Sequence, residues 1–506
     1  MEQDLVITID IGTTTIKACL WGTSLEAPLA VRSIEYALDA ADGRIEVAPE
    51  VYLDAVRGVL GALVGEVGSA ERIRAVCCTT QGETLIAVDA DGTPLGNAIV
   101  WLDSRAGSDA ARLEEHLGSE RVYRTTGVAR LTGAVPVAKV AMLRRTDPAR
   151  YHGAVRFLLL EDFVVSALTG RTVTTPSLQT STGWFDVGAD DYWDAALRAA
   201  GIAREQLPDL VESGTTVGAV LPSWCRVTGL ADGTVVIAGA MDQTAAALAA
   251  GVTGPGVANV TFGTALTVTA TLDVVPEPHP DGHRTTFYRH VVPQRLLAIE
   301  FLPTGAVVLR WLRDLLGRER HDYADLDALA EVVAPGAGGV LALAHLASAA
   351  DPAGDAPGGF LGVGMDTGPG HLVRGVMEAT AFELHTMLGR LADAGCRPED
   401  LRTSGGGARS GVWQRITADV CGIPLTPLTQ SEASSAGAAL LALWGSGLRH
   451  RGQGLDLSGS PRLHPDPSLR ETYDRGMRRS ARVGAALAAA WPDPLPLDPT
   501  PEGRSR

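Results

Sequence analysis

Apolar residues in this chain occur in short β-branched runs that alternate with longer stretches of helical spacing. The short runs of the first half predict strands at residues 5–11, 73–79, 84–89, 97–101 and 235–241. Helical spacing covers residues 49–67 and most of residues 109–168, and an Ala-rich stretch that ends at Ala250 predicts one more helix. Strands that alternate with helices are typical of an α/β layer fold.

The second half continues this alternation after Gly254-Pro255-Gly256, which has the composition of a hinge. Helices are predicted at residues 305–316, 371–391, 412–421 and 434–444. A chain of 506 residues exceeds the size at which a single core usually stops growing, so we expect two domains, at residues 1–252 and 253–490. Residues 491–506 are rich in Pro and Asp, which predicts a loosely attached tail.

One local pattern occurs in both halves. Residues 5–20 and 257–270 each predict two strands joined by a Gly-Thr tip. Glycine lets backbone N–H groups approach a bound anion, and threonine hydroxyls add donors. Two such tips, one from each half, could hold one nucleoside triphosphate from both sides, which favours an ATP-using enzyme built from two related halves. Ordinary β-turns would use the same residues, and no Gly-Lys-Ser/Thr phosphate loop accompanies them.

The composition indicates which kinds of partner and which cellular compartment fit this chain. An apolar content of 45% and a charged content of 20% are typical of a globular protein. The net charge of −16 argues against nucleic acid or an anionic membrane as a partner. The start of the chain lacks a basic leader, and no apolar run is long enough to cross a bilayer. The 6 cysteines are scattered without a C-x-x-C pair, which fits a reducing cytosol, so we expect a cytoplasmic protein.

Two aspartates are the strongest candidates for chemistry. Asp242 ends an apolar strand and precedes a helix, so it should lie at the mouth of the sheet between the domains. A carboxylate there can accept the proton of a hydroxyl that receives a phosphoryl group, and its alternative role is a helix cap. Asp10 ends the first strand and could hold Mg²⁺ through water or cap the turn. Lys17 lies across the hairpin, where it would face either phosphate or solvent.

Two further segments have the composition of ligand sites. Gln81-Gly82-Glu83 follows a buried strand, and Trp101 ends another. A flat indole with a few directed polar groups suits a small polyhydroxylated ligand, although Trp101 could equally be a core residue and Glu83 a surface one. We expect Asp103 and Arg105 to pair and to shape this loop. Gly405-Gly406-Gly407 opens a helix and could let an adenosine ring lie against the backbone, or could be an ordinary flexible loop.

Taken together, these motifs resemble the FGGY family of carbohydrate kinases, within the actin/Hsp70/hexokinase-like ATPase superfamily. The resemblance extends from Leu5 to Trp491. The segments that carry it are the hairpin Asp10-Ile-Gly-Thr-Thr-Thr, the sugar-side stretch at 97–105, the segment Gly239-Ala-Met-Asp-Gln, the adenosine segment at 405–415 and Ser431-Glu-Ala-Ser-Ser-Ala-Gly-Ala-Ala, which resembles the next helix of the family.

The resemblance implies two RNase H-like domains of the actin-like ATPase type, with the active site in the cleft between them. It implies ATP and Mg²⁺ as cofactors, with Asp242 as the catalytic base and Asp10 at the metal. The residues implied at ATP are Gly12, Thr13, Thr14, Thr15, Lys17, Gly263 and Thr264 for the phosphates, and Gly305, Gly406, Gly407 and Ser410 for the adenosine. The residues implied at the sugar are Gln81, Gly82, Glu83, Trp101 and Asp242. The resemblance is also compatible with a homodimer.

The departures from the family pattern concern the substrate. Glycerol kinases carry Arg-Glu where this chain has Gly82-Glu83, and xylulokinases usually show Met-His-Gly where it has Thr80-Gln81-Gly82. Residues 347–351 replace a Gly-Glu-Arg-like loop that is common in the family, and residues 174–181 lack an aspartate often found there. The pattern therefore supports the phosphoryl-transfer machinery better than any one substrate.

Three readings of the function follow. The leading one is an ATP-dependent kinase of a small sugar, a ketose such as xylulose. Glycerol, erythritol and gluconate are the alternatives within that class. The alternative of another class is a non-catalytic, actin-like ATP-binding regulator. The presence of both Asp10 and Asp242 weighs against that reading, because a protein that only binds ATP would not require both.

Overall fold

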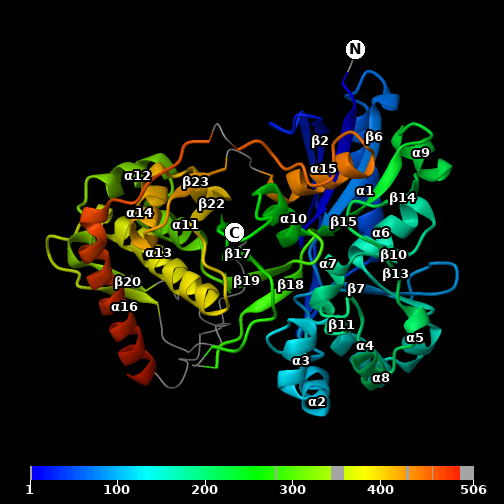
Figure 1. Cartoon of the computed structure of the whole chain (residues 1–506), viewed down its shortest axis with the longest axis horizontal. Helices are drawn as coiled ribbons and strands as arrows, with labels where there is room; N and C mark the ends of the chain where they lie inside the picture. Colours follow the sequence, from blue (N-terminus) through cyan, green and yellow to red (C-terminus); the bar gives the residue numbers. More distant parts are fainter. Residues whose placement is uncertain (1–2, 280–281, 344–357, 429–431, 458–459, 491–506) are drawn as a thin grey trace.

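The computed structural model describes residues 3–279, 282–343, 358–428, 432–457 and 460–490. These residues form two lobes, each built on a six-stranded mixed sheet (Figure 1). The first sheet contains, in spatial order, β14 (Thr216–Ala219), β15 (Val235–Met241), β6 (Ile73–Thr80), β1 (Leu5–Ile11), β2 (Thr15–Gly22) and β3 (Ala30–Glu35). The second contains β18 (Thr286–Arg289), β19 (Leu296–Leu302), β17 (Leu266–Leu272), β16 (Val257–Phe262), β22 (Asp400–Ser404) and β23 (Leu425–Pro427).

The three central strands of the first sheet run parallel. β6 lies between β15 and β1 and pairs with both, whereas β2 and β3 continue the sheet as antiparallel strands. Parallel strands covered on both faces are nearly continuous apolar runs, which is what the sequence shows. Within β1 only Asp10 is not fully buried, so its carboxyl group lies where the strand leaves the core.

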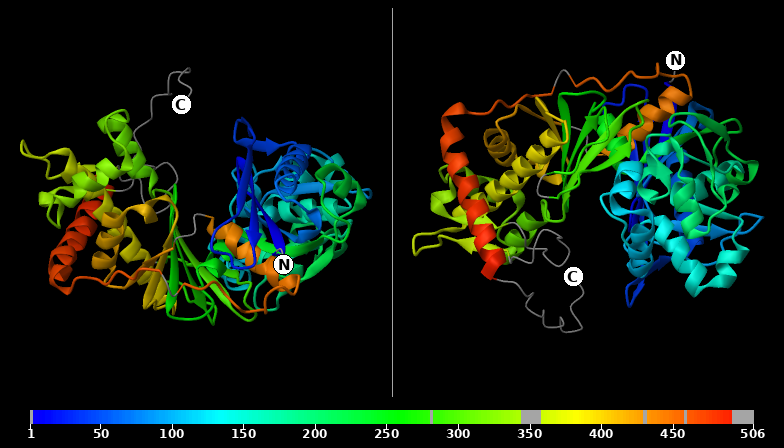
Figure 2. Two further views of the ribbon diagram at one scale, coloured as in Figure 1. Left: turned by 90° about the horizontal axis from the view of Figure 1, so that it is seen from above. Right: turned by 60° about the horizontal axis from the view of Figure 1, so that its bottom comes forward.

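Helices cover both faces of this sheet. One face packs against α1 (Pro49–Val64), α6 (Leu160–Thr169) and α9 (Pro222–Thr228). The other face packs against α10 (Asp242–Ala249) and α15 (Ala433–Gly445), which also pack against each other (Figure 2). Since α15 comes from the second half of the chain, both halves contribute helices to this face of the first sheet.

A peripheral layer completes the first lobe. Its five-stranded sheet contains, in spatial order, β4 (Asp39–Ala41), β5 (Arg44–Val47), β8 (Ala98–Ile99), β7 (Leu85–Val88) and β9 (Arg156–Leu159). The helices of this layer are α2 (Gly107–Leu117), α3 (Ser119–Thr126), α4 (Pro136–Thr146), α5 (Pro148–Gly153), α7 (Pro176–Gln179) and α8 (Asp194–Ala200). Two-residue strands form the pairs β10 (Val173–Thr174) with β13 (Asp209–Leu210), and β11 (Phe185–Asp186) with β12 (Asp191–Tyr192). The sequence did not predict β9, because a short apolar run between helices has no period that distinguishes a strand.

The second lobe is built in the same way. Its helices are α11 (Val307–Gly317), α12 (Tyr323–Glu331), α13 (Pro369–Asp393), α14 (Gly411–Cys421) and α16 (Arg470–Ala490). The long α13 packs against β17, β19, α12 and α14, so it forms the centre of this lobe's core. A two-stranded sheet of β20 (Leu341–Leu343) and β21 (Gly359–Leu361) lies beside α13.

The elements that carry the predicted site residues are confirmed, apart from shifts of a few residues at helix ends and a strand at 97–101 that is reduced to the two residues of β8. All 6 cysteines are buried and free. In the described part of the chain, no helix is long and apolar enough to cross a membrane. Residues 347–351, Ser431 and the predicted tail at 491–506 lie outside the described residues.

Candidate active site

The first hairpin tip presents unused backbone donors. The turn between β1 and β2 is closed by the Gly12 N–H, which donates to the Thr15 carbonyl at 3.0 Å. Tyr36 fastens the tip from β3's end: its N–H donates to the Thr14 carbonyl at 2.9 Å, and its hydroxyl donates to the Gly12 carbonyl. Within the described residues, the N–H groups of Thr13 and Thr14 donate to no backbone carbonyl. The tip therefore has the free donors that an anion needs.

The hydroxyl of this tip is tied to the predicted sugar loop. The Thr13 hydroxyl accepts a hydrogen bond of 3.0 Å from the Trp101 indole and donates one of 3.1 Å to the Gln81 side-chain oxygen. The Gln81 N–H donates to the Ile11 carbonyl at 3.1 Å, which fixes the loop after β6 against the end of β1. The side-chain amide nitrogen of Gln81 is buried and has no hydrogen-bond partner among the described residues. It is free to donate to a ligand.

Three carboxyl groups lie at the ends of the parallel strands. Asp10 closes β1, Glu83 follows β6 and Asp242 follows β15, so the parallel order of the strands brings them to one edge of the sheet. Burial and the neighbouring Asp242 raise the pKa of Asp10 to about 7, against the opposing effect of Lys17. Burial and the neighbouring Glu83 likewise raise the pKa of Asp242 to about 7.

Asp242 is the first residue of α10 rather than its cap. Its carboxylate accepts a hydrogen bond of 2.6 Å from the adjacent Gln243 N–H, and Met241 occupies the capping position. The carboxyl group therefore satisfies one first-turn N–H from within the helix, and Asp242 is not the N-cap residue that the alternative requires.

A bulge in β15 sets the direction of this strand end. The pairing of β15 with β6 shifts register between Ile237 and Ala240, and the Gly239 N–H donates to the Glu161 carboxyl at 2.8 Å. A Cβ atom at Gly239 would lie 1.7 Å from the Cys78 carbonyl oxygen, so only glycine fits. Burial and the neighbouring Asp162 raise the pKa of Glu161 to about 8.

Lys17 is paired rather than directed at solvent. Its ammonium donates to the Glu432 carboxylate at 2.7 Å. Glu432 directly precedes α15, and Ser435 on that helix lies 2.5 Å from the Thr8 hydroxyl of β1. These two contacts fasten α15 to both strands of the first hairpin, β2 through Lys17 and β1 through Thr8.

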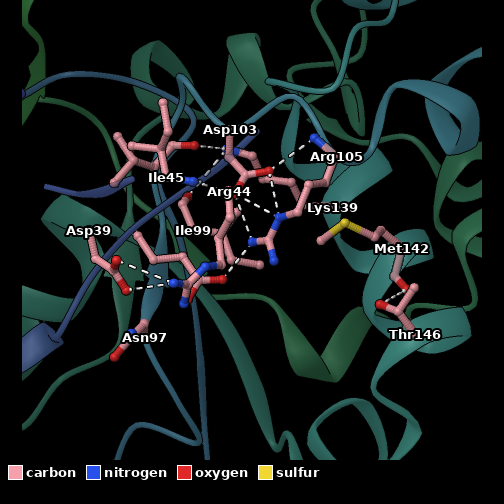
Figure 3. A network of polar contacts seen from close by, with 12 residues as sticks. Asp39, Arg44, Ile45, Asn97, Ile99, Asp103, Arg105, Lys139, Met142 and Thr146 are labelled. Carbon is pink, nitrogen blue, oxygen red and sulfur yellow. Dashed lines mark hydrogen bonds and ion pairs between the residues drawn. The ribbon is translucent and has the colours of Figure 1, made fainter. Parts of the chain in front are cut away.

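Lys139 supports the sugar loop from behind. This fully buried residue of α4 donates to the carbonyls of Glu83 at 2.7 Å, Val100 at 2.9 Å and Ile99 at 3.3 Å. Figure 3 shows its position beside Ile99. Burial lowers the pKa of the Lys139 ammonium, while Glu83 acts to raise it.

The predicted pair of Asp103 and Arg105 is confirmed. The Arg105 guanidinium lies 2.7 Å from the buried Asp103 carboxylate (Figure 3). It also lies 2.5 Å from the Glu46 carboxylate. Asp103 also accepts from the Ile45 N–H at 2.9 Å. These bonds fix the loop after β8, which contains Trp101.

Glu83 occupies a constrained position. Its φ of 64° is in the left-handed region, which is uncommon for a residue with a side chain. Burial raises the pKa of its carboxyl group, although Lys139 and a hydrogen bond with Ser181 act in the opposite direction. At the preceding Gly82, a Cβ atom would lie 2.9 Å from the Ser181 hydroxyl, so a larger residue cannot be added without displacing Ser181. Tyr288 of the second lobe adds to this group, since burial, Glu83 and Asp242 raise the pKa of its hydroxyl.

The second hairpin tip is supported by the segment before α11. The Gly263 N–H donates to the Ala265 carbonyl at 3.0 Å, and Thr264 is exposed. Gly305 donates to the Thr264 carbonyl at 2.8 Å, and a Cβ atom there would lie 2.3 Å from the backbone of Ala265. Gly305, predicted at the adenosine, thus packs directly beneath the hairpin.

The triple glycine divides into packed and open positions. Cβ atoms at Gly405 and Gly407 would lie 2.6 Å and 2.8 Å from atoms of Phe262, so both are needed for the close packing of this turn on β16. Gly406 is exposed, with no atom within 4 Å of such a Cβ. Ser410 caps α14 by accepting from the Trp413 N–H at 3.1 Å and donates to Asp327 at 2.7 Å, so its hydroxyl is already used.

The structure therefore brings together Asp10, Thr13, Gln81, Glu83, Trp101 and Asp242. Sequence reasoning missed Lys139, Glu161, Tyr288 and Glu432, which reach this group from other elements. Among the described residues, no group of three or more His, Cys, Asp or Glu side chains is arranged as a metal centre.

The sequence matches two family descriptions. The FGGY family of carbohydrate kinases, N-terminal domain, matches residues 5–249, and the C-terminal domain of the same family matches residues 258–446. Xylulose kinase of Escherichia coli K12 is 28% identical over 442 residues, which are 87% of this chain and 89% of that protein. Gluconokinase of Bacillus subtilis 168 is 26% identical over 454 residues, which are 87% of each. The crystal structure of xylulose kinase from Rhodospirillum rubrum aligns with a TM-score of 0.87 at 30% identity and covers 97% of this chain and 100% of that one.

Proposed function

This chain belongs to the FGGY family of carbohydrate kinases, and we propose that it transfers the γ-phosphate of ATP to a hydroxyl of a neutral small sugar, a ketose such as xylulose. The carboxyl group of Asp242 carries this proposal. It lies at the end of β15, half-buried, and burial with the neighbouring Glu83 raises its pKa to about 7. A base is most effective when its pKa lies near the working pH, and this one is suited to accept the proton of an attacking hydroxyl.

The proposed step needs little from the protein besides position and charge. The sugar oxygen forms a bond to the γ-phosphorus, its proton passes to Asp242, and the bond from that phosphorus to the bridging oxygen breaks, which releases ADP. Free N–H groups at Thr13 and Thr14 support phosphate binding at the first tip, and the exposed Thr264 supports it at the second. The open face at Gly406 would lie against the adenosine.

Mg²⁺ would be held by Asp10 together with water, since Mg²⁺ takes few protein ligands and prefers oxygen. Burial and the charge of Asp242 raise the pKa of Asp10 to about 7, so the ionised carboxylate is disfavoured. A cation beside Asp10 would stabilise that ionised form. When bound, the ion would supply neutralisation of charge on the phosphates.

The charges around the sugar residues favour a neutral substrate. Asp10, Glu83 and Asp242 already repel one another, as the raised pKa values of Asp10 and Asp242 indicate. Lys17 is paired with Glu432, and Lys139 is directed at three backbone carbonyls. A sugar acid would bring a further carboxylate to this group, with neither lysine free to pair with it. Gluconate is therefore the weaker candidate, although one of the relatives is a gluconokinase.

The alternatives differ in what they require of these residues. A polyol such as glycerol or erythritol would also be neutral and is the second candidate. A non-catalytic ATP-binding regulator would not need a base with a pKa near 7 beside the sugar loop.

The proposal is tested by measuring kcat/KM with ATP and Mg²⁺ for xylulose, glycerol, erythritol and gluconate. We expect the ketose to give the highest value and gluconate the lowest. Gluconate as the best substrate would contradict the neutral assignment. ATP binding without turnover of any neutral sugar would favour the regulator.

A further inference from the structure

Lysine is almost absent from this chain. Of its 43 lysine and arginine residues, only Lys17 and Lys139 are lysine, and the structure brings both to the candidate active site. On an exposed surface either residue serves equally well, so a chain that uses arginine almost everywhere else can keep lysine where only a compact ammonium fits. Lys17 already has a carboxylate partner in Glu432. Lys139 has no such direct ion pair among the described contacts and makes a different set of bonds.

The three bonds of Lys139 link the two loops of the sugar subsite. One goes to the carbonyl of Glu83, in the loop after β6, at 2.7 Å. The other two go to the carbonyls of Ile99 and Val100, directly before Trp101, at 3.3 Å and 2.9 Å. An ammonium group has three donors, and all three are used. The planar guanidinium of arginine carries five donors, which these converging carbonyls cannot satisfy.

The charge of Lys139 also acts on Glu83. The groups that face the ammonium are the carboxyl groups of Glu83 and Asp103, which attract it, and the Arg105 guanidinium, which repels it. Asp103 and Arg105 neutralise each other in an ion pair at 2.7 Å. Glu83 is therefore the carboxyl group left for Lys139 to stabilise. Without that charge, Glu83 would be a partly buried carboxylate with one hydroxyl partner, Ser181, and a stronger tendency to take up a proton.

We propose that Lys139 is the positioning residue of the sugar subsite: it fixes the Glu83 and Trp101 loops relative to each other and keeps Glu83 ionised as an acceptor for a substrate hydroxyl. The proposal rests on the proposed function, because Glu83 meets a sugar hydroxyl only if this subsite binds a sugar. Lys139 itself is fully buried and acts through the Glu83 carbonyl to which it donates.

The two-lysine composition allows a direct test on the intact protein. With lysine labelled by ¹³C at the ε carbon, the chain gives two side-chain signals, and Lys139→Met identifies one of them by its loss. We expect the Lys139 signal to titrate at lower pH than the Lys17 signal, and Glu83→Gln to move the Lys139 titration to still lower pH. A Lys139 titration that Glu83→Gln leaves unchanged would overturn the electrostatic link. This measurement does not depend on finding a substrate, so it separates failure of this inference from failure of the proposed function.

Kinetics test the positioning role. Lys139→Met should raise the KM of the sugar at least tenfold, since the loss of one charge-assisted hydrogen bond changes affinity by about tenfold or more. It should also shift the acid limb of kcat/KM to higher pH. The Kd of ATP should stay within about twofold of that of the unsubstituted protein. Val140→Ala on the same helix removes buried volume without charge and should lower the melting temperature with the sugar KM unchanged. Equal loss of sugar and ATP binding in Lys139→Met would show a purely structural role. Should Lys139→Met not fold, the titration with Glu83→Gln decides the question.

Discussion

The indole N–H of Trp101 donates a hydrogen bond of 3.0 Å to the hydroxyl of Thr13. The sequence assigns these residues to different ligands, the sugar and the phosphates. Their contact, continued from Thr13 to Gln81 at 3.1 Å, makes the phosphate hairpin and the sugar loop one hydrogen-bonded unit. A movement of Trp101 on sugar binding would therefore also move Thr13, in the hairpin tip that would hold the phosphates.

Trp101→Phe tests this coupling. The substitution keeps a flat ring and removes the N–H donor, which leaves the Thr13 hydroxyl with Gln81 alone. We expect both the KM of the sugar and the Kd of ATP to rise about fivefold, as expected for the loss of one hydrogen bond of about 1 kcal/mol. Trp444→Phe removes a comparable indole bond to the Gln453 carbonyl and is the control. A change in the sugar KM with no change in ATP binding would contradict the coupling.

The acid limb of the pH profile should report Asp242. Its pKa, raised to about 7 mainly by burial and also by Glu83, means that kcat/KM rises with pH through about 7 as the carboxyl group loses its proton. Glu83→Gln removes a negative neighbour, which lowers the pKa of Asp242 and moves this limb to lower pH whatever its effect on the absolute rate. A limb that moves to higher pH in Glu83→Gln would contradict the arrangement of charges.

Glu161→Gln should change how stability depends on pH. Burial raises the pKa of Glu161 to about 8 in the folded protein, above that of an unfolded glutamate, so the unfolded state loses its proton first as pH rises. The folded protein is therefore stabilised by the protonated Glu161 carboxyl group. This contribution to the free energy of unfolding is complete below the pKa of an unfolded glutamate and is lost as the pH rises toward about 8. Glutamine keeps the oxygen that accepts from the Gly239 N–H and cannot ionise.

We therefore expect the free energy of unfolding of Glu161→Gln to match that of the unsubstituted protein at pH 3.5, below the pKa of an unfolded glutamate. At pH 8.5 its free energy of unfolding should be higher by at least about 1 kcal/mol, since each pKa unit corresponds to about 1.4 kcal/mol. Denaturant unfolding at the two pH values measures this. Equal stability of the two proteins at both pH values would show that Glu161 is not a buried acid of raised pKa.

Gly305→Ala should weaken nucleotide binding without unfolding the chain. The added methyl group would lie 2.3 Å from the backbone of Ala265, so the tip at Thr264 must move. We expect the Kd of ATP to rise at least tenfold and the sugar KM to change little. Gly389→Ala, within α13, meets no atom within 4 Å and serves as the control. Unchanged ATP affinity in Gly305→Ala would remove the second hairpin from the nucleotide site.

The sequence was a good guide to groups that end strands. Asp10 and Asp242 interrupt apolar runs, and parallel strands that share a sheet bring such interruptions to the same edge. The Gly-Thr tips were predictable for the same reason, because turn residues mark the ends of β-branched runs. These local signals were enough for the fold class, both hairpins and the two principal carboxylates.

The partners of these groups were not predictable, because they come from distant parts of the chain. Glu432 lies 415 residues from Lys17, directly before a helix whose pattern gives no sign that it returns to the first sheet. Tyr288 reaches the carboxylates from the other lobe, and Lys139 occupies a helix position that periodicity alone marks as core. The one signal for Lys139 was compositional, the near absence of lysine elsewhere.

Asp242→Asn tests the central claim most directly. The substitution keeps the shape of the side chain and removes its ability to accept a proton, so ADP release from ATP and Mg²⁺ with the best neutral sugar should fall by a factor of about 10² or more. The melting temperature should stay close to that of the unsubstituted protein. Turnover near that of the unsubstituted protein would contradict Asp242 as the base and, with it, the proposed course of phosphoryl transfer.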